Sequence, residues 1–399
     1  MSGDAGGQAL ATTANRFGSL IGRLTFRTTE SETEHKALAS FTLANLFVRC
    51  TVNGLTAGSK VVTSRINRVN GNLTVSFAAG VTGLAEDLVN TDALVDGNEF
   101  NAILTGGNGA ESVTFTIEAA TLQHASSDIP LLGATPSSTV NFGAGTRFFG
   151  LMGEGASGSA EAAHQYIFRV AATLSKMMAN VPVSSTNGDY TYKSRKNTAD
   201  GAQTVTITAG VTGQFEDTVN TDAIAAGDVA NTTVIPGGTA GGIELRTSQM
   251  QSAAVGRQMA ATRNASNNVS SDVYLAAEGI RGQSATQAHS QKTARTAFVA
   301  KNLFVRVGAH GASSGVDIDF QQNDVDSALD VTIAASTTGT FEDTTDTVTM
   351  AAADRYDYFL NHGGGAGSIS CTIIGFELAQ PAAGAASPKG QFTLLGVGA

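Results

Sequence analysis

A fifteen-residue segment occurs twice in this chain almost unchanged, and a shorter version of it occurs a third time. Residues 79–93 read AGVTGLAEDLVNTDA and residues 209–223 read AGVTGQFEDTVNTDA, so twelve of fifteen positions agree at a spacing of 130 residues. The third copy keeps Gly339, Glu342 and Asp343. Solenoid repeats have periods of about 20–50 residues, so a spacing this long indicates tandem copies of a whole domain.

Long spacings of one unit or of two units relate other parts of the chain. Residues 64–67 (SRIN) return as 194–197 (SRKN), and residues 45–49 (NLFVR) return as 302–306. We therefore expect an N-terminal arm at 1–15, a first unit at 16–135, a second unit with its preceding linker at 136–262, and a third unit at 263–399. Units of about 120–140 residues have the size of ordinary domains.

Hydrophobic and polar residues alternate strictly within each unit. The apolar members are Leu73, Val75 and Phe77 in the first unit, Val205 and Ile207 in the second, and Leu329, Val331 and Ile333 in the third. A period of two residues is typical of half-buried strands, and the Gly, Asn and Asp residues between such runs mark turns. We predict an all-β fold of three tandem antiparallel β-sandwich or jelly-roll-like domains with little helix.

One segment fits a helix on propensity alone. Residues 161–179 (EAAHQYIFRVAATLSKMMA) would form an amphipathic helix. They align with residues 42–48, however, where the pair Phe47-Val48 is typical of a strand. We therefore predict β structure here as well.

Bulk properties exclude several classes of partner. The formal net charge is −10 and the pI is near 5.1, and no block of Lys or Arg occurs, so we expect no nucleic-acid or membrane partner. Residues 1–17 lack the charged start and apolar stretch of a signal peptide, so we expect synthesis in the cytoplasm of the producing cell. Cys50 and Cys371 lie on apolar, strand-like segments and are predicted to be free buried thiols.

Two Gly-rich segments resemble phosphate-binding loops only superficially. Residues 153–158 (GEGASG) satisfy GxGxxG, but no strand-helix-strand pattern surrounds them. Residues 54–60 (GLTAGSK) have the wrong glycine spacing and precede Val61 instead of Ser or Thr. We predict no catalytic residue, no cofactor-binding residue and no cofactor.

Histidines occur at related places in the three units. The pairs are Glu32 with His35, Glu161 with His164, and Thr286 with His289. In helical bundles Glu-x-x-His pairs are metal ligands, but such sites need four helices, which this sequence does not offer. We expect these histidines to precede the first long strand of each unit, in a segment that contacts a neighbouring unit.

The Glu-Asp motif has two interpretations. Calcium prefers hard oxygen donors such as those of Glu86, Asp87, Asn90, Asp92 and Asp96, although their spacing matches no EF-hand loop. Short polar side chains also close turns by accepting hydrogen bonds from nearby backbone amides. We favour turn closure, keep calcium as the alternative, and assign no metal site.

The repeated motifs together carry a resemblance. They are NLFVR near the start of a unit, an Asn after the mid-domain strand, the GxxED segment, the turns at Gly97-Asn98, Gly227-Asp228 and Asp354, and the Gly-rich hairpins at 106–107, 237–238 and 363–365. This pattern resembles a recurring β-sandwich domain of virion structural proteins in tailed bacteriophages, and it covers all three units. Residues 176–178 (KMM) depart from it, so contacts of the second unit are expected to differ.

The resemblance implies a non-enzymatic role on the virion surface. We expect an outer capsid decoration (cement) subunit whose partners are other virion proteins, above all the major capsid protein, and copies of itself. The alternatives are a trimeric tail fibre or appendage protein and a bacterial surface adhesin; an enzyme or carbohydrate-binding module on a sandwich scaffold is a further one. We also expect the arm at 1–15 to lie against another chain.

Overall fold

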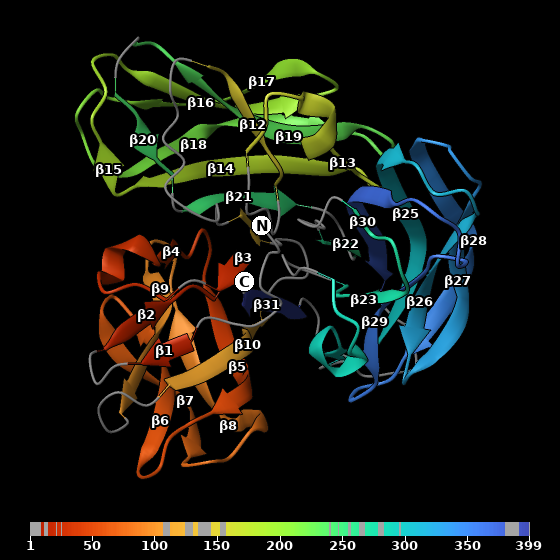
Figure 1. Ribbon diagram of the computed structural model, residues 1–399. Coiled ribbons are helices and arrows are strands. Elements are labelled where there is room, and N and C mark those ends of the chain that lie inside the picture. The colour runs from red at the N-terminus through yellow and green to blue at the C-terminus, as the bar shows by residue number, and fades with distance from the viewer. Residues whose placement is uncertain are drawn as a thin grey trace. The chain divides into compact units, whose positions relative to one another are not determined.

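The computed structural model describes an all-β chain (Figure 1). The described residues are 9–11, 15–20, 22–24, 26–106, 112–123, 131–134, 145–151, 157–238, 241–245, 247–253, 257–262, 268–277, 283–294, 297–379 and 391–398. Within them the helical elements are three short 3-10 turns, η1 (Glu30–Glu32), η2 (Glu161–His164) and η3 (Gln287–His289). No helix of this described part is long and apolar enough to cross a membrane.

The strands form three pairs of sheets, which we call repeat 1, repeat 2 and repeat 3. Sheet I of each repeat contains its longest central strand, and sheet II contains a tight hairpin. In repeat 1 sheet I has the order β3 (Gly22–Leu24), β31 (Gln391–Gly398), β10 (Ser112–Gln123), β5 (Phe41–Asn53), β8 (Gly83–Leu94), with β1 (Ala9–Ala11) also on β10. Sheet II has the order β2 (Arg16–Gly18), β9 (Glu99–Gly106), β6 (Ser59–Ile66), β7 (Val69–Ala78), with β4 (His35–Lys36) on β9.

The other two repeats have corresponding sheets. Sheet I of repeat 2 runs β11 (Leu131–Ala134), β21 (Thr247–Ala253), β14 (Ala172–Val181), β18 (Gly213–Ile224), and that of repeat 3 runs β22 (Arg257–Thr262), β30 (Ile369–Ala379), β25 (Phe298–His310), β28 (Gly339–Met350). Sheet II of repeat 2 runs β12 (Arg147–Phe149), β19 (Val229–Pro236), β16 (Tyr190–Lys196), β17 (Ala199–Ile207), with β13 (Tyr166–Ile167) on β19. Sheet II of repeat 3 runs β23 (Val273–Leu275), β29 (Arg355–Asn361), β26 (Val316–Gln322), β27 (Val325–Ile333), with β24 (Lys292–Thr293) on β29.

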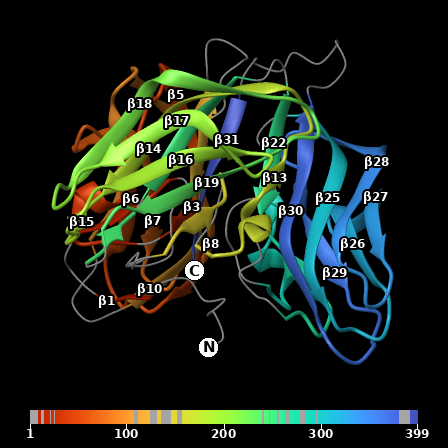
Figure 2. The ribbon, with the colours of Figure 1, turned by 90° about the horizontal axis from the view of Figure 1, so that it is seen from above.

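A short pair, β15 (Val183–Ser184) and β20 (Ile243–Glu244), is separate from these sheets. The strand pairs are antiparallel except that β3 and β31 are parallel. Figure 2 shows β25 between β30 and β28, as their pairing requires.

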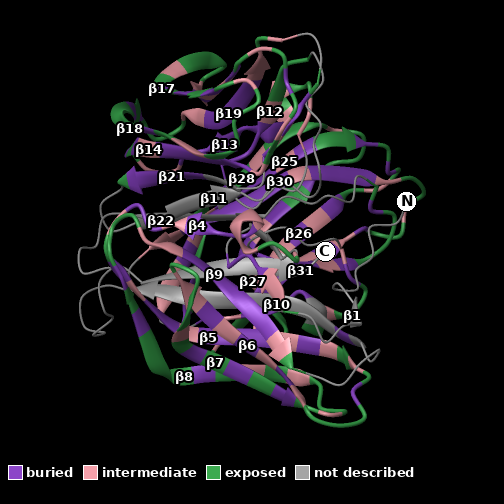
Figure 3. Cartoon of the chain, turned by 90° about the vertical axis from the view of Figure 1, so that its left-hand side faces the viewer, coloured by how far each residue is buried: buried purple, intermediate pink, exposed green. Residues whose placement is uncertain are grey.

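In repeat 1 and in repeat 3 a hydrophobic core lies between sheet I and sheet II of the same repeat. In repeat 1 Leu46 and Val48 of β5 join Val75 and Phe77 of β7 in one buried cluster. The alternation predicted from the sequence is confirmed, because Leu73, Val75, Phe77, Val205, Ile207, Leu329, Val331 and Ile333 are all buried. In Figure 3 buried and exposed residues also follow one another along β8. The fold is therefore all-β with sandwich-like sheet pairs.

The segment 161–179 is β structure for most of its described length. It contains β13 and most of β14, as predicted, but its first residues form the 3-10 turn η2. Pairing and burial explain the outcome. Met178 and Ala179 pair with both β18 and β21, Met177 pairs with β18, and all three residues are fully buried. Tertiary pairing thus overrides helix propensity here.

Equivalent turns recur with the same backbone conformation. Asn67, Asn197 and Asn323 begin the sheet II hairpins with φ of 48°, 49° and 52°, and the residues that follow them also have positive φ. Two central residues with positive φ are the mark of a type I′ turn, whose twist matches that of the flanking strands. Gly83, Gly213 and Gly339 begin β8, β18 and β28 with φ of 111°, 123° and 126°. Both sets of residues predicted to be equivalent are confirmed.

The outer edge of sheet I in each repeat is closed by a strand from elsewhere in the sequence, which we call a donated strand. β11 follows β10 of repeat 1 but pairs with β21 of repeat 2. β22 follows β21 of repeat 2 but pairs with β30 of repeat 3. β31 follows β30 of repeat 3 and pairs with β10 of repeat 1. The order of donation is therefore cyclic.

The chain divides into two compact units. One contains the sheets of repeat 3 and the other those of repeats 1 and 2 together with β31. The unit boundaries and the arm that we derive from the sequence remain predictions. Most of the arm at 1–15 lies outside the described residues, and its described segment Ala9–Ala11 pairs with β10 of the same chain.

The hairpin of repeat 2 provides a test of the turn assignment. Thr198 is exposed and adopts a φ of 67°, which is strained for a β-branched residue. We expect Thr198→Gly to raise the free energy of unfolding by about 1 kcal/mol, because Asn-Gly is the preferred pair in a type I′ turn. Chemical denaturation measures the change. The matched control Thr206→Gly, at an exposed position inside β17, should instead lower stability; a loss in both variants would contradict the assignment.

Candidate functional site: the polar networks of the repeats

The aspartate of the repeated Glu-Asp motif organises a bulge in sheet I. Between the pairs Ala44↔Thr91 and Leu46↔Asp87, one residue of β5 faces three residues of β8. The Asp87 carboxylate accepts hydrogen bonds from the backbone N–H of Thr74 at 2.8 Å and of Asn90 at 3.0 Å. Asp217 makes the same bonds to Thr204 and Asn220, and Asp343 bonds Thr345 and Asp346. The carboxylate thus binds N–H groups of the bulge itself and, in repeats 1 and 2, one N–H of the last strand of sheet II.

These hydrogen bonds decide the charge state of the aspartate. Burial of Asp87 acts to raise its pKa, but bonds from the Asn90 side chain and from the backbone N–H groups of Thr74, Asn90 and Val89 outweigh burial, so the pKa lies below its ordinary value. The pKa of Asp217 is lowered in the same way. The motif therefore presents an ionised carboxylate whose oxygens are occupied by backbone donors.

A second acidic residue of the motif is also bound internally. Asp92 accepts a hydrogen bond from the Ser64 hydroxyl at 2.5 Å and from the backbone N–H of Asn72 at 2.7 Å. Any Cβ at Gly71 would collide with Ser64 and Asp92, so glycine is required there. These contacts agree with turn closure, the favoured interpretation. Among the residues that the structure describes, no group of three His, Cys, Asp or Glu side chains is arranged to hold a metal ion.

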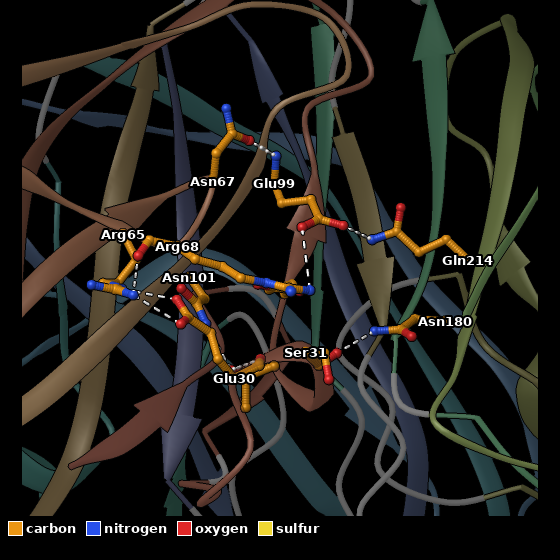
Figure 4. A network of polar contacts seen from close by, with 11 residues as sticks. Glu30, Ser31, Arg65, Asn67, Arg68, Glu99, Asn101, Asn180 and Gln214 are labelled. Carbon is orange, nitrogen blue, oxygen red and sulfur yellow. Dashed lines mark hydrogen bonds and ion pairs between the residues drawn. The ribbon is translucent and has the colours of Figure 1, made fainter. Parts of the chain in front are cut away.

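An arginine links the 3-10 turn to the hairpin of sheet II in repeats 1 and 2. Arg65 donates two hydrogen bonds to Glu30, at 2.8 and 2.9 Å (Figure 4). It donates a third to Asn70 at 2.7 Å. Its guanidinium also lies 5.8 Å from the centre of the Phe17 ring. In repeat 2, Arg195 makes the equivalent contacts with Glu161, Asp200 and Phe148. Paired bonds between guanidinium and carboxylate are strong and directional, so they fix the 3-10 turn on the sheet.

Repeat 3 has lost this ion pair. The register of β26 and β29 places Gln321 where repeat 1 has Arg65, and Asp357 where it has Asn101. Gln321 donates to Asp326 at 2.6 Å, and Gln287 donates to Asp357 at 3.4 Å. Asp357 is fully buried, and its second oxygen has no hydrogen-bond partner. Burial, followed by the nearby charges of Asp324 and Asp326, raises the pKa of Asp357 to about 7.

The three histidines do not occupy equivalent positions, contrary to the prediction. His35 lies in β4 opposite Phe100, is fully buried and contacts the Ser19 hydroxyl. His164 instead ends η2, and burial lowers its pKa to about 4. His289 ends η3. The pairing of β13 with β19 places Tyr166 where repeat 1 has His35, so the short spacing between Glu and His misled the alignment.

The described residues of the other motifs singled out in the sequence lie in connections and strand ends. Residues 54–60 form the connection before β6 and its first two residues, and the Lys60 ammonium bonds the Gly106 carbonyl at 2.5 Å. Most of residues 153–158 lie outside the described part. A GxSxG pattern at 311–315, which the sequence analysis missed, lies in the hairpin between β25 and β26, where the Ser313 hydroxyl accepts a bond from the Ala366 N–H at 2.9 Å. Cys50 and Cys371 are buried thiols that form no disulfide with one another, as predicted.

Polar side chains of sheet I in repeat 2 bind the surface of repeat 1. The buried Gln249 amide accepts from the backbone N–H of Lys36 at 2.8 Å and donates to the Lys36 carbonyl at 3.2 Å. Figure 4 shows Asn180 directed at the Ser31 carbonyl, at 2.8 Å, and Gln214 at Glu99, also at 2.8 Å. Lys36 further pairs with Glu216. The side-chain amide of Gln249 therefore bonds both backbone groups of Lys36, as the backbone of a neighbouring strand would.

Lys176 explains part of the departure of repeat 2 from the common pattern. It occupies the bulge position of Asn45 and Asn302, and all three residues have φ between 51° and 53°. Lysine is less suited than asparagine to this conformation. Its ammonium, however, bonds Asp96 at 2.6 Å and the Leu38 carbonyl at 2.5 Å in repeat 1. The substitution therefore adds a contact between repeats, as the sequence led us to expect.

Comparison with known proteins adds no relative: no protein-family model and no characterised protein matches this sequence.

The contact between repeats 1 and 2 depends most on Gln249. We expect Gln249→Ala to lower the free energy of unfolding by about 1–3 kcal/mol, because both backbone groups of Lys36 lose a buried partner. Chemical denaturation of the full chain measures the loss. The control Gln214→Ala removes one contact to a half-buried carboxylate at the same surface and should cost less than about 1 kcal/mol. Equal losses for the two variants would contradict the dominant role of Gln249.

Asp357 should make stability depend on pH. Its pKa is about 7 in the folded protein and lies near 3.8 when unshifted, so the folded state holds the proton more tightly. Stability should therefore fall as pH rises from about 4 to 7 and then level off. Asp357→Asn restores the residue type of Asn101 and Asn231 and should remove this slope, with a gain of about 2–4 kcal/mol at pH 8. Melting curves across pH test it. An unchanged slope, or the same gain from Asp346→Asn at an exposed site, would contradict the assignment.

Proposed function

We propose that this chain is a non-enzymatic structural protein of a bacteriophage virion, and specifically an outer capsid decoration subunit. The observation that carries the proposal is that the aspartate of the Glu-Asp motif binds the protein backbone. In all three repeats its aspartate accepts backbone hydrogen bonds at a bulge of sheet I. The aspartate that recurs in all three repeats thus fixes the backbone of sheet I. Such a role suits a structural protein.

The contacts between repeats support the same role. The strand β11, which follows repeat 1 in the sequence, completes sheet I of repeat 2, and Gln249, Lys176 and Asn180 add hydrogen bonds between these two repeats. Backbone pairing and buried amides resist separation better than exposed ion pairs do. Such reinforcement suits a subunit that has to persist on the outside of a particle.

The proposal includes partners and location. The partners are the major capsid protein and copies of this chain, and the chain resides on the virion surface after synthesis in the host cytoplasm. The sequence resemblance to β-sandwich domains of virion proteins supports this choice, and the acidic net charge of −10 suits a surface exposed to solvent instead of one facing packaged DNA.

Fractionation of phage particles tests the proposal. Particles from the virus that encodes this chain are purified and separated into heads and tails, and the chain is quantified against the major capsid protein in each fraction. A decoration subunit should remain with heads in proportion to the capsid protein. Recovery only with tails would favour the fibre or appendage instead, and recovery only with uninfected bacterial surfaces would favour the adhesin. Either result would overturn the proposal.

A further inference from the structure

The outer edge of β10 in repeat 1 is covered by both ends of the chain. β31 pairs with β10 from Ile117 to Gln123, and β1 pairs with it from Ser112 to Thr114. β31 also pairs with β3 on its other side. The two terminal strands thus follow one another along a single edge, with β31 held between two partners.

The corresponding edge in repeat 3 is covered by β22 and, at one further point, by Val269. β22 pairs with β30 from Ile374 to Ala379, and Val269 farther along the same segment bridges Ile369. By the register of β5 and β25, Ile369 corresponds to Val113, which pairs with Leu10 of β1. In repeat 1, therefore, two strands far apart in the sequence cover the edge that β22 and Val269 cover in repeat 3.

The segments that precede the donated strands differ in length. Residues 124–130 lie between β10 and β11, residues 254–256 between β21 and β22, and residues 380–390 between β30 and β31. A stretch of eleven residues can span at most about 40 Å at 3.3–3.6 Å per residue. β31 also belongs to a different compact unit from the strand that precedes it. Of the three donated strands, β31 therefore follows the longest connecting segment.

We propose that β31 exchanges between copies of this chain, so that repeat 1 of one copy is completed by β31 of another. The backbone pairs of β31 with β3 and β10 are the same in the closed and the exchanged form, so chain concentration decides between them. An empty position would leave two unpaired strand edges, which are prone to pair with any available strand. The partner is a second copy of this chain, and the inference rests on strand pairing alone, independently of the virion role.

Cysteine pairs placed across β10 and β31 test the exchange. Ala119 and Leu395 are directly opposite one another, and such Cα atoms lie about 4.5–5.5 Å apart, which a disulfide spans. One chain carries Ala119→Cys and a second chain, of different tag length, carries Leu395→Cys. The two are unfolded, refolded together and oxidised, and disulfide-linked heterodimers are quantified on non-reducing gels. The double variant in one chain verifies the register.

The expected result is a heterodimer yield that rises about tenfold when chain concentration is raised about tenfold in the dilute range. The matched control places Leu132→Cys and Met250→Cys on separate chains, across β11 and β21, where the tether is shorter and both repeats lie in one compact unit. This control should give no more heterodimer than the native thiols do. Equal yields for the two mixtures, or an intrachain disulfide without any heterodimer, would overturn the proposal.

Discussion

The outer edge of sheet I is the constraint on which the rest of the chain depends. β10, β21 and β30 each pair with the central strand on one side and need hydrogen-bond partners on the other. An uncovered edge would invite uncontrolled pairing with other chains. In each repeat the edge receives a strand that follows the preceding repeat, and repeat 1 receives β31. Each sheet I is thereby completed by a strand that is separated in the sequence from the rest of that sheet.

Within this common frame the three repeats have diverged in their polar networks. Repeat 1 places Arg68 at the hairpin against Glu34, 2.8 Å away, whereas repeat 3 places Asp324 there and pairs it with Arg355. The charge pattern is reversed while the turn keeps its backbone conformation. In repeat 3 the loss of the arginine leaves Asp357 buried with a raised pKa. Backbone geometry is thus common to all repeats, and electrostatics distinguishes them.

The sequence predicted the features that depend on local periodicity and turn chemistry. Alternation identified Leu73, Val75 and Phe77 as buried, and the recurring Asn67 and Gly83 identified equivalent turns, because strand period and positive φ restrict residue type directly. The acidic motif does bind backbone amides, as expected, but Asp87 does so at a bulge inside β8 and not in a turn. These features need no knowledge of distant contacts.

The prediction that was wrong and the features that were not predicted all depend on pairing between distant segments. The histidine alignment was wrong because the register of β4 and β13 is set by β9 and β19, not by the spacing from Glu to His. The donated strands were missed because a short apolar segment such as 131–134 carries no mark of the sheet it joins. The amide of Gln249, which binds Lys36 across 213 positions of sequence, has no local signal.

Amide hydrogen exchange in β31 tests the central claim most directly. If β31 completes repeat 1, the backbone amides of Gln391–Gly398 that face β10 or β3 should exchange slowly, with protection comparable to that of β10 itself. Peptides from this segment are measured by mass spectrometry beside peptides from β10 and β5 of the same chain. Exchange of β31 at the rate of an unstructured peptide, while β5 stays protected, would contradict the account.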